Sequence, residues 1–98
     1  MNIDRENDTL KINNSGDITA TNVEDIRKSI LEELDESLKF VEVNLNEVEL
    51  IDSTGISLLI SIQNSLTKNE GRLKIKNANE NISYMFNMMR LNHHFEIN

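Results

Sequence analysis

The sequence predicts an α/β fold, a single domain with a mixed sheet of four to five strands and about three helices packed on it. Some segments alternate apolar and polar residues, as strands do, and others have apolar residues at helical spacing. The two kinds of segment follow one another along the chain. The 98 residues contain no proline, and no repeat or low-complexity linker marks a boundary. We therefore expect one domain over residues 1–98, with right-handed crossovers between parallel strands.

The first predicted elements are a strand and a helix joined by a turn. Residues 9–13 (TLKIN) alternate apolar and polar side chains, and Ser15-Gly16-Asp17 has the composition of a turn. Thr21 and Glu24 have the spacing of a capping box, so a helix of about four turns should follow. The apolar residues on one face of this helix are Val23, Ile26, Ile30 and Leu34.

The middle of the chain predicts a strand, a short acidic connection and a long helix. Residues 40–45 (FVEVNL) alternate and contain β-branched residues, which favours a strand. The apolar pair Leu50-Ile51 then leads into Asp52-Ser53-Thr54-Gly55, and we expect a helix from residue 53 to about 69. The apolar stripe of this helix is Leu58, Leu59, Ile62 and Leu66, on the same side as Gly55.

The last third predicts a strand, a helix and a closing strand. Residues 69–71 (NEG) end the long helix, and residues 72–76 (RLKIK) alternate as a strand. Asn79 can cap a helix, and residues 94–97 (HFEI) should form a last short strand. The expected core positions of the helix are Ile82, Met85, Phe86 and Met89.

Composition and charge exclude several classes of function. The net charge is −7, without a stripe of lysine or arginine, so nucleic acid is not an expected partner. The absence of cysteine removes disulfides and thiolate metal sites. A membrane span needs about 18 or more apolar residues, and no such run or signal-peptide layout occurs. We expect a cytoplasmic protein without membrane insertion.

The tetrapeptide Asp52-Ser53-Thr54-Gly55 lies where a strand pattern ends and a helix begins. Asp52 or Ser53 is expected at the N-cap, where a side-chain oxygen accepts a hydrogen bond from a free N–H group. Capping alone would explain one such residue. A helix N-terminus also stabilises an anion, so an exposed Ser53 is a plausible phosphate acceptor. Gly55 would allow another backbone to approach closely.

Other candidates for chemistry are weaker. His93 and His94 are adjacent, and in a strand their side chains would point to opposite faces and could not bind one metal together. Neither a Gly-x-Ser-x-Gly motif nor a convincing triad supports Ser53 as a hydrolase nucleophile. We expect no catalytic residue, no metal site and no cofactor.

Three segments together resemble the STAS domain, in particular the anti-sigma factor antagonists. They are residues 45–60 (LNEVELIDSTGISLLI), 15–26 (SGDITATNVEDI) and 81–97 (NISYMFNMMRLNHHFEI). The first resembles the family's strand and Asp-Ser-Ser/Thr-Gly motif, the second its early turn into a helix, and the third its later helix and final strand. The resemblance spans most of the chain.

The resemblance implies a phosphorylation-controlled switch that is not itself an enzyme. Ser53 matches the family's phosphorylated serine, Asp52 its preceding acid and Thr54 its following hydroxyl residue. Unphosphorylated, the protein would bind an anti-sigma factor with GHKL-type serine kinase activity and free a sigma factor. A PP2C-type serine phosphatase would reverse the phosphorylation. The expected partner-binding residues are Asp17, Thr19, Ile56, Ser57 and Ile60. On a helical wheel Ile56 and Ile60 border the outward face of the helix, where they either contact a partner or pack under the first or third helix.

The sequence departs from the family pattern in several places. The family often has an acidic residue where Thr19 stands, and here the acid is Asp17. Ser57 and Arg90 occupy positions where glycine is common. Many members add a helix after the last strand, beyond the position of Asn98. The alternative function implied by the resemblance is a structural STAS subunit of a transport or signalling complex.

Overall fold

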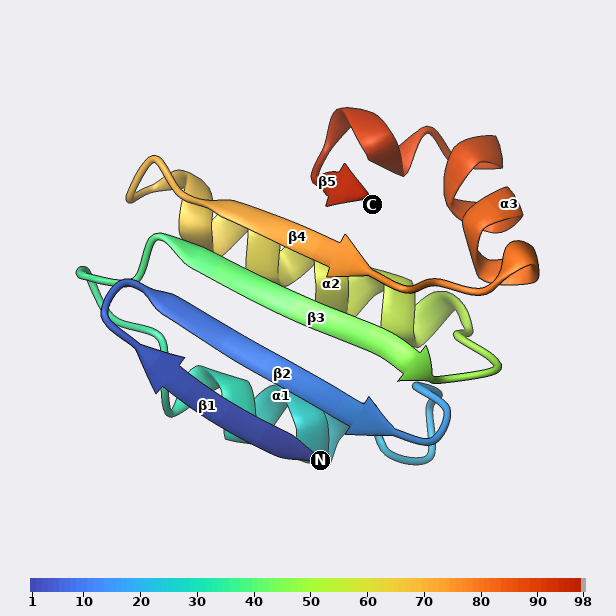
Figure 1. The fold of residues 1–98 in the computed structure, drawn as a ribbon, viewed down its shortest axis with the longest axis horizontal. Helices are drawn as coiled ribbons and strands as arrows, with labels where there is room; N and C mark the ends of the chain where they lie inside the picture. Colours follow the sequence, from blue (N-terminus) through green and yellow to red (C-terminus); the bar gives the residue numbers. More distant parts are fainter. Residues whose placement is uncertain (98) are drawn as a thin grey trace.

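The structure, a computed structural model, describes residues 1–97 as a two-layer α/β domain (Figure 1). Five strands form one sheet in the order β1-β2-β3-β4-β5, with β1 antiparallel to β2 and every other pair parallel. The predicted mixed sheet and three helices are therefore confirmed. The strands are β1 (Asn2–Glu6), β2 (Thr9–Ser15), β3 (Phe40–Glu47), β4 (Arg72–Lys76) and β5 (Glu96–Ile97). The helices are α1 (Val23–Leu31), α2 (Ser53–Thr67), α3 (Glu80–Met88) and the short 3₁₀ helix η1 (Leu91–His93).

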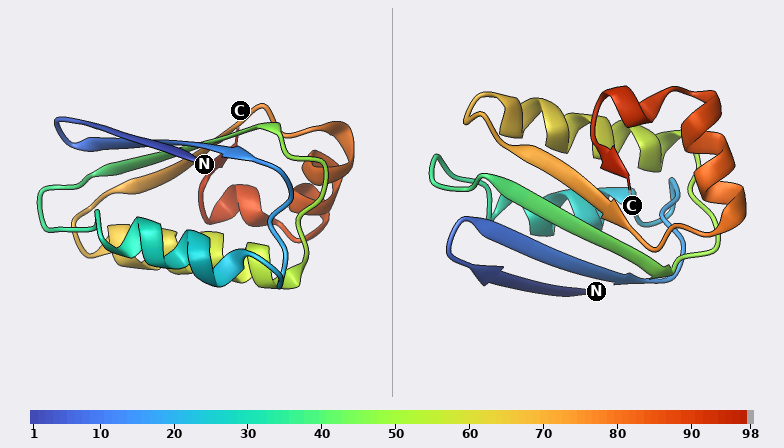
Figure 2. Two further views of the ribbon diagram at one scale, coloured as in Figure 1. Left: turned by 90° about the horizontal axis from the view of Figure 1, so that it is seen from below. Right: turned by 45° about the horizontal axis from the view of Figure 1, so that its top comes forward.

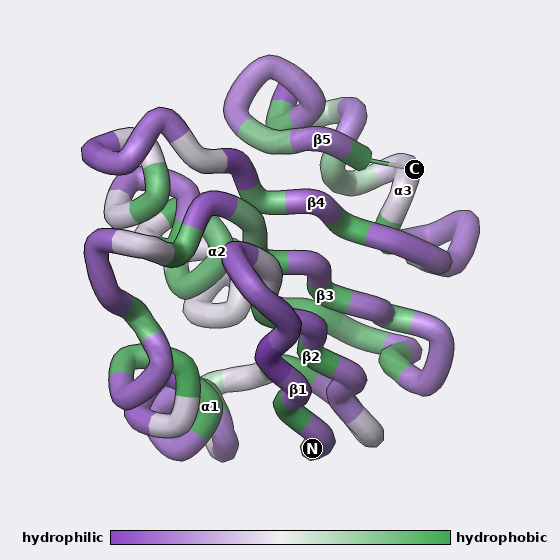
Figure 3. The backbone as a smooth tube through the Cα atoms, turned by 60° about the vertical axis from the view of Figure 1, so that its left-hand side comes forward, coloured by the Kyte–Doolittle hydropathy of each residue, from purple (hydrophilic) through white to green (hydrophobic). Residues whose placement is uncertain are grey.

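Helices α1 and α2 lie on the same face of the sheet (Figure 2). Buried apolar residues alternate with more exposed ones along β2, β3 and β4, and the buried ones belong to the core between the sheet and these helices. The colours along β3 and β4 in Figure 3 alternate in the same way. We call the other side of the sheet the open face. One row of residues across it alternates in charge: Asp4, Lys11, Glu42, Lys74 and Glu96. Opposite charges on neighbouring strands make this face compatible with water.

The edge strand β1 does not appear in the sequence prediction. Only Ile3 is apolar among its five residues, which leaves no alternating pattern to detect. A two-residue turn at Asn7-Asp8 joins β1 to β2, and Asn7 takes a positive φ of 57°, which asparagine tolerates better than most residues. Arg5 ties the strand to the connection after α1, because its guanidinium binds both carboxylate oxygens of Asp35 at 3.0 and 3.2 Å.

Helix α1 is shorter than predicted and has a different cap. Its N-cap is Asn22, whose side chain accepts no capping hydrogen bond and instead accepts the N–H of Thr19 at 2.9 Å. The predicted capping box that begins at Thr21 is therefore wrong. The helix ends at Leu31, and Leu34 is half-buried in the following connection. The predicted cap of α3 is confirmed, since the Asn79 side chain accepts the N–H of Ile82 at 2.8 Å.

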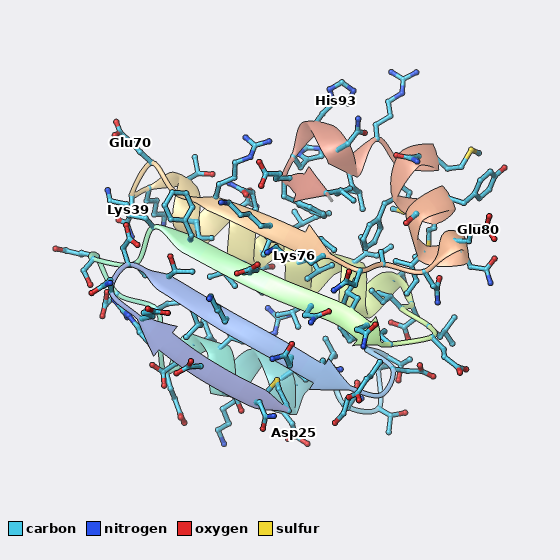
Figure 4. All side chains as sticks on the ribbon, viewed as in Figure 1. Asp25, Lys39, Glu70, Lys76, Glu80 and His93 are labelled. Atoms are coloured by element: carbon cyan, nitrogen blue, oxygen red, sulfur yellow. The ribbon has the colours of Figure 1, made fainter. Side chains whose placement is uncertain are left out.

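The C-terminal segment contributes a buried aromatic residue to the core, and it corrects two expectations. Phe95 is buried and packs edge-to-face on Phe86, with ring centroids 6.0 Å apart. The predicted strand over residues 94–97 is only Glu96–Ile97, because a 3₁₀ turn precedes it. His93 therefore lies in η1 and points outward (Figure 4). Met89 follows the last residue of α3 and is exposed, not part of the core.

Candidate functional site

The motif that opens α2 lies at the end of the sheet where the parallel strands β2 and β3 terminate (Figure 1). Two loops meet there, residues 16–22 after β2 and residues 48–52 after β3. The N–H of Ile18 donates to the Leu50 carbonyl at 3.0 Å, and the N–H of Asp52 donates to the Ile18 carbonyl at 3.2 Å. The carboxyl ends of parallel strands are where open α/β sheets usually bind ligands and partners.

Asp52 is the N-cap of α2 and also joins the two loops. Its Oδ1 accepts the N–H groups of Thr54 and Gly55, at 2.9 and 3.1 Å, together with the Thr54 hydroxyl. Its Oδ2 accepts the N–H of Ala20 at 2.9 Å. The bond from the Thr54 hydroxyl, followed by that from Ala20, lowers the pKa of the Asp52 carboxyl below its usual value. The side chain is therefore ionised at neutral pH and holds the start of α2 against the loop that precedes α1.

Gly55 is required by close packing. A Cβ atom at this position would lie 2.6 Å from the Ile18 carbonyl oxygen and 2.7 Å from Cγ2 of Ile51. Both isoleucines are buried, so neither side chain can swing into solvent. The expected close approach of another backbone at Gly55 is confirmed, and the approaching backbone is that of Ile18.

Ser53 and Thr54 differ in their surroundings. Ser53 is the first residue of α2 and is exposed, and its hydroxyl forms no hydrogen bond within residues 1–97. Thr54 is half-buried, and its hydroxyl donates to Asp52. Helix α2 begins at Ser53, as the sequence predicts, and Thr54 is its second residue. Two of the free N–H groups expected to receive an anion, those of Thr54 and Gly55, already donate to Asp52.

The two expected partner-binding residues before α1 have structural contacts. Asp17 Oδ1 accepts the N–H groups of Glu49 and Leu50, at 3.2 and 3.0 Å, and so holds the loop after β3 in place. Thr19 is half-buried, and its carbonyl accepts the N–H of Asn22 at 3.0 Å. Both residues shape the loops beside Ser53.

The three expected partner-binding residues on α2 have different orientations. Ile56 is only 4% exposed and belongs to the core, so the expectation that it borders the outward face is wrong. Ile60 is half-buried and packs against the core. Ser57 is exposed one helical turn after Ser53. A helical wheel gives the direction of a side chain but not how far neighbouring elements cover it, which explains the error at Ile56.

Leu50 is an exposed residue near Ser53 that the sequence analysis did not single out. Its side chain is 55% exposed, whereas that of Ile51 is buried. Adjacent residues of an extended segment point to opposite sides, so only one member of the pair Leu50-Ile51 can face the core. This alternation was the available signal, but it does not say which of the two residues lies outside.

Within residues 1–97 no possible general base is hydrogen-bonded to the Ser53 hydroxyl. The neighbouring carboxylate of Asp52 bonds to Thr54 and Ala20, and no hydrogen bond links Ser53 to a histidine within residues 1–97. In this part of the chain no group of three or more His, Cys, Asp or Glu side chains could hold a metal ion. None of the helices formed by residues 1–97 is long and apolar enough to cross a membrane.

Solved structures share this fold at low sequence identity. The protein TM1081 from Thermotoga maritima, assigned as an anti-sigma factor antagonist, is 18% identical with a TM-score of 0.89, over 98% of this chain and 83% of that one. The Bacillus cell-fate determinant SpoIIAA in its phosphorylated form is 19% identical with a TM-score of 0.78, over 99% and 89% of the two chains. A sulfate transporter family protein from Wolinella succinogenes is 21% identical with a TM-score of 0.72, over 87% and 69%.

A family model identifies the chain directly. No curated protein sequence matches it significantly. The model of the STAS domain, however, matches residues 1–98. This match agrees with the strand order and with the helix that opens at Asp52-Ser53-Thr54-Gly55. The chain belongs to the STAS domain family.

Proposed function

We propose that this STAS domain is an anti-sigma factor antagonist that acts in the cytoplasm as a phosphorylation-controlled partner switch. Unphosphorylated, it binds an anti-sigma factor that is also a GHKL-type serine kinase, and a sigma factor is released. Phosphorylation of Ser53 by that kinase ends the association, and a PP2C-type serine phosphatase restores it. The observation that carries the proposal is the exposed, unengaged hydroxyl of Ser53 at the first residue of α2, beside a Thr54 hydroxyl that is bonded to Asp52.

The similarity to SpoIIAA supports this proposal. Structures with this fold are known for SpoIIAA in both its unphosphorylated and its phosphorylated form. In this chain Ser53 is the exposed serine at the start of α2, where a modification would meet solvent instead of the core. The fold should therefore accommodate a phosphate on Ser53 without unfolding.

A phosphate would change the surface next to Ser53 more than the fold beneath it. It adds about −1.5 to −2 charges to a chain whose formal charge is −7. The Asp52 carboxylate lies beside it and already binds the nearest N–H groups, so the phosphate would depend mainly on water. A partner that covers a neutral Ser53 would have to remove that water and accommodate the added bulk, which disfavours binding.

The decisive experiment is mass spectrometry of the chain after incubation with its cognate kinase and ATP. The Ser53→Ala variant should remain unmodified, while Thr54→Val and Ser57→Ala should each carry one phosphate. Ser57 is the matched control, because it is an exposed serine one turn along the same helix. Phosphate retained on Ser53→Ala and lost from Thr54→Val would overturn the assignment.

Binding experiments test the switch itself. The Ser53→Ala variant should stay folded and remain bound to the kinase in the presence of ATP. The Ser53→Asp variant should stay folded and bind poorly, because it places a charge on the covered surface. Equal affinity of the wild-type and Ser53→Asp chains would show that a negative charge at Ser53 does not control association.

The second candidate function is a structural STAS subunit of a transport or signalling complex. The similarity to the sulfate transporter family protein from Wolinella succinogenes favours it. In that case Ser53 would contribute packing or surface polarity and would not be modified. Identification of the chain captured by the unphosphorylated protein from its source cells distinguishes the two functions, since the switch requires a GHKL-type kinase.

A further inference from the structure

Leu50 presents an apolar side chain from a fixed backbone beside Ser53. The side chain is 55% exposed, although Ile51 next to it is buried. The Leu50 N–H donates to Asp17 Oδ1 at 3.0 Å, and its carbonyl accepts the N–H of Ile18 at 3.0 Å. Single exposed leucines are common on protein surfaces. This one is distinguished by its place three residues before Ser53, in a loop that hydrogen bonds hold in position.

The loop that carries Leu50 is also held from the side of α3. The Asn79 side-chain amide donates to the Glu49 carbonyl at 3.1 Å and to the Val48 carbonyl at 3.4 Å. Val48 itself is buried. A loop fixed in this way loses little conformational entropy when a partner covers it, so more of the contact energy appears as affinity.

The loops after β2 and β3, which meet beside Leu50, carry acidic side chains and no basic ones. Lys76, which ends β4 at the same end of the sheet, is paired with Glu42. Residues 12–26 and 43–67, which include the loops after β2 and β3, contain no lysine or arginine. Their six carboxylates are Asp17, Glu24, Asp25, Glu47, Glu49 and Asp52. A surface of one sign favours encounter with a partner of the opposite sign. At the other end of the sheet, where Figure 4 labels Lys39 and Glu70, the charged side chains carry both signs: Glu36, Lys39, Lys68 and Glu70.

We propose that Leu50 is the apolar anchor of the partner-binding surface, and that the partner offers it an apolar pocket rimmed by lysine or arginine side chains. This inference rests on the proposed function and names the chemistry of the kinase surface that covers Ser53. The acidic surroundings speed encounter with the rim, and the fixed Leu50 side chain contributes burial in the pocket.

The same arrangement explains how a phosphate on Ser53 releases a basic partner. The phosphate would stand at the edge of the pocket that holds Leu50, where association removes water. The cations of the rim already face the carboxylates of this chain, so the phosphate gains little additional attraction from them. Loss of hydration by a charged group at an apolar contact is unfavourable by more than this attraction supplies. Phosphorylation therefore weakens binding in spite of the favourable sign of the charge.

The test uses calorimetry at low and high salt to measure how tightly the unphosphorylated chain binds its kinase. The kinase is the GHKL-type enzyme that mass spectrometry has shown to modify Ser53. The Leu50→Ala variant should bind about tenfold or more weakly, with the same salt dependence as the wild-type chain. The matched control is Leu31→Ala. Leu31 is 56% exposed but is the last residue of α1, and its substitution should change affinity by less than about twofold. Glu49→Gln should weaken binding less and reduce its salt dependence.

The outcomes separate the anchor from the proposed function. The melting temperature of Leu50→Ala must be close to that of the wild-type chain, so that a loss of affinity cannot come from unfolding. We expect this result because the Leu50 side chain is exposed. Affinity of Leu50→Ala equal to that of Leu31→Ala overturns the anchor but leaves the switch intact, provided that Ser53→Asp still binds poorly. Binding that is insensitive to salt overturns the basic rim. If the wild-type chain binds no such kinase, the proposed function fails, and the anchor fails with it.

Discussion

Substitution of Gly55 by alanine should destabilise the domain, although alanine is the better helix former. A Cβ atom at this position would lie 2.6 Å from the Ile18 carbonyl oxygen, 2.7 Å from Cγ2 of Ile51 and 2.9 Å from Cγ2 of Ile18. A Cβ atom essentially never lies within 3.0 Å of another heavy atom to which it is not bonded, so α2 or the loop after β2 must shift. The shift would also disturb the Ile18 carbonyl that accepts the N–H of Asp52.

The expected loss of stability in Gly55→Ala is the difference between two opposing contributions. Replacing glycine by alanine in a helix stabilises by up to about 1 kcal/mol. Overpacking of a core typically destabilises by about 1 to 3 kcal/mol, and a backbone carbonyl is less able to move than the end of a side chain. We expect a net loss in the free energy of unfolding of about 1 to 2 kcal/mol. In a domain of this size that lowers the melting temperature by roughly 10 °C.

Urea denaturation followed by far-UV circular dichroism measures this loss. The control is Ser57→Ala on the same helix, where the side chain is exposed and no clash arises. This control should remain within about 0.5 kcal/mol of the wild-type chain. A Gly55→Ala variant as stable as Ser57→Ala would refute the reasoning, because the close approach of Ile18 to α2 would then be absent in solution.

Three further predictions concern stability. Phe95→Ala should lower the free energy of unfolding by about 3 to 5 kcal/mol, because Phe95 is buried against Phe86. A denaturation curve like that of the wild-type chain would show that residues 94–97 are not part of the core. Arg90 takes a positive φ of 56°, which strains any residue with a Cβ atom. Arg90→Gly should therefore raise the free energy of unfolding by about 1 kcal/mol, and Arg90→Ala should not. Equal effects of the two substitutions would rule out this strain. The Arg5 guanidinium, followed by the Ser37 hydroxyl, lowers the pKa of Asp35 from 3.8 to about 2, so this carboxylate stabilises the fold above pH 3.8 and loses its contribution as the pH falls toward 2. Melting temperatures measured across that pH range should fall less steeply for Arg5→Ala, and identical slopes would contradict the role of Arg5.

The sequence by itself determined the elements whose patterns are local. The alternation in RLKIK predicted β4 at the residues where it occurs, because side chains of a strand point to opposite faces with a period of two. The apolar stripe of α2 and its start at Asp52-Ser53 were equally predictable, since helical spacing and N-cap chemistry both act within a few residues. The candidate modification site, Ser53 at the start of α2, belongs to this class.

Only the tertiary structure decided which side chains of the site face solvent. Asp17 bonds to the N–H of Leu50, 33 residues away in the sequence, and that pairing fixes Leu50 outside while Ile51 lies in the core. Ile56 stands at the side of its helix where the wheel predicts exposure, yet surrounding core residues cover it. Hydrophobic periodicity gives the direction of a side chain relative to its own element. Exposure depends on which distant segments pack beside that element, and the local sequence carries no record of them.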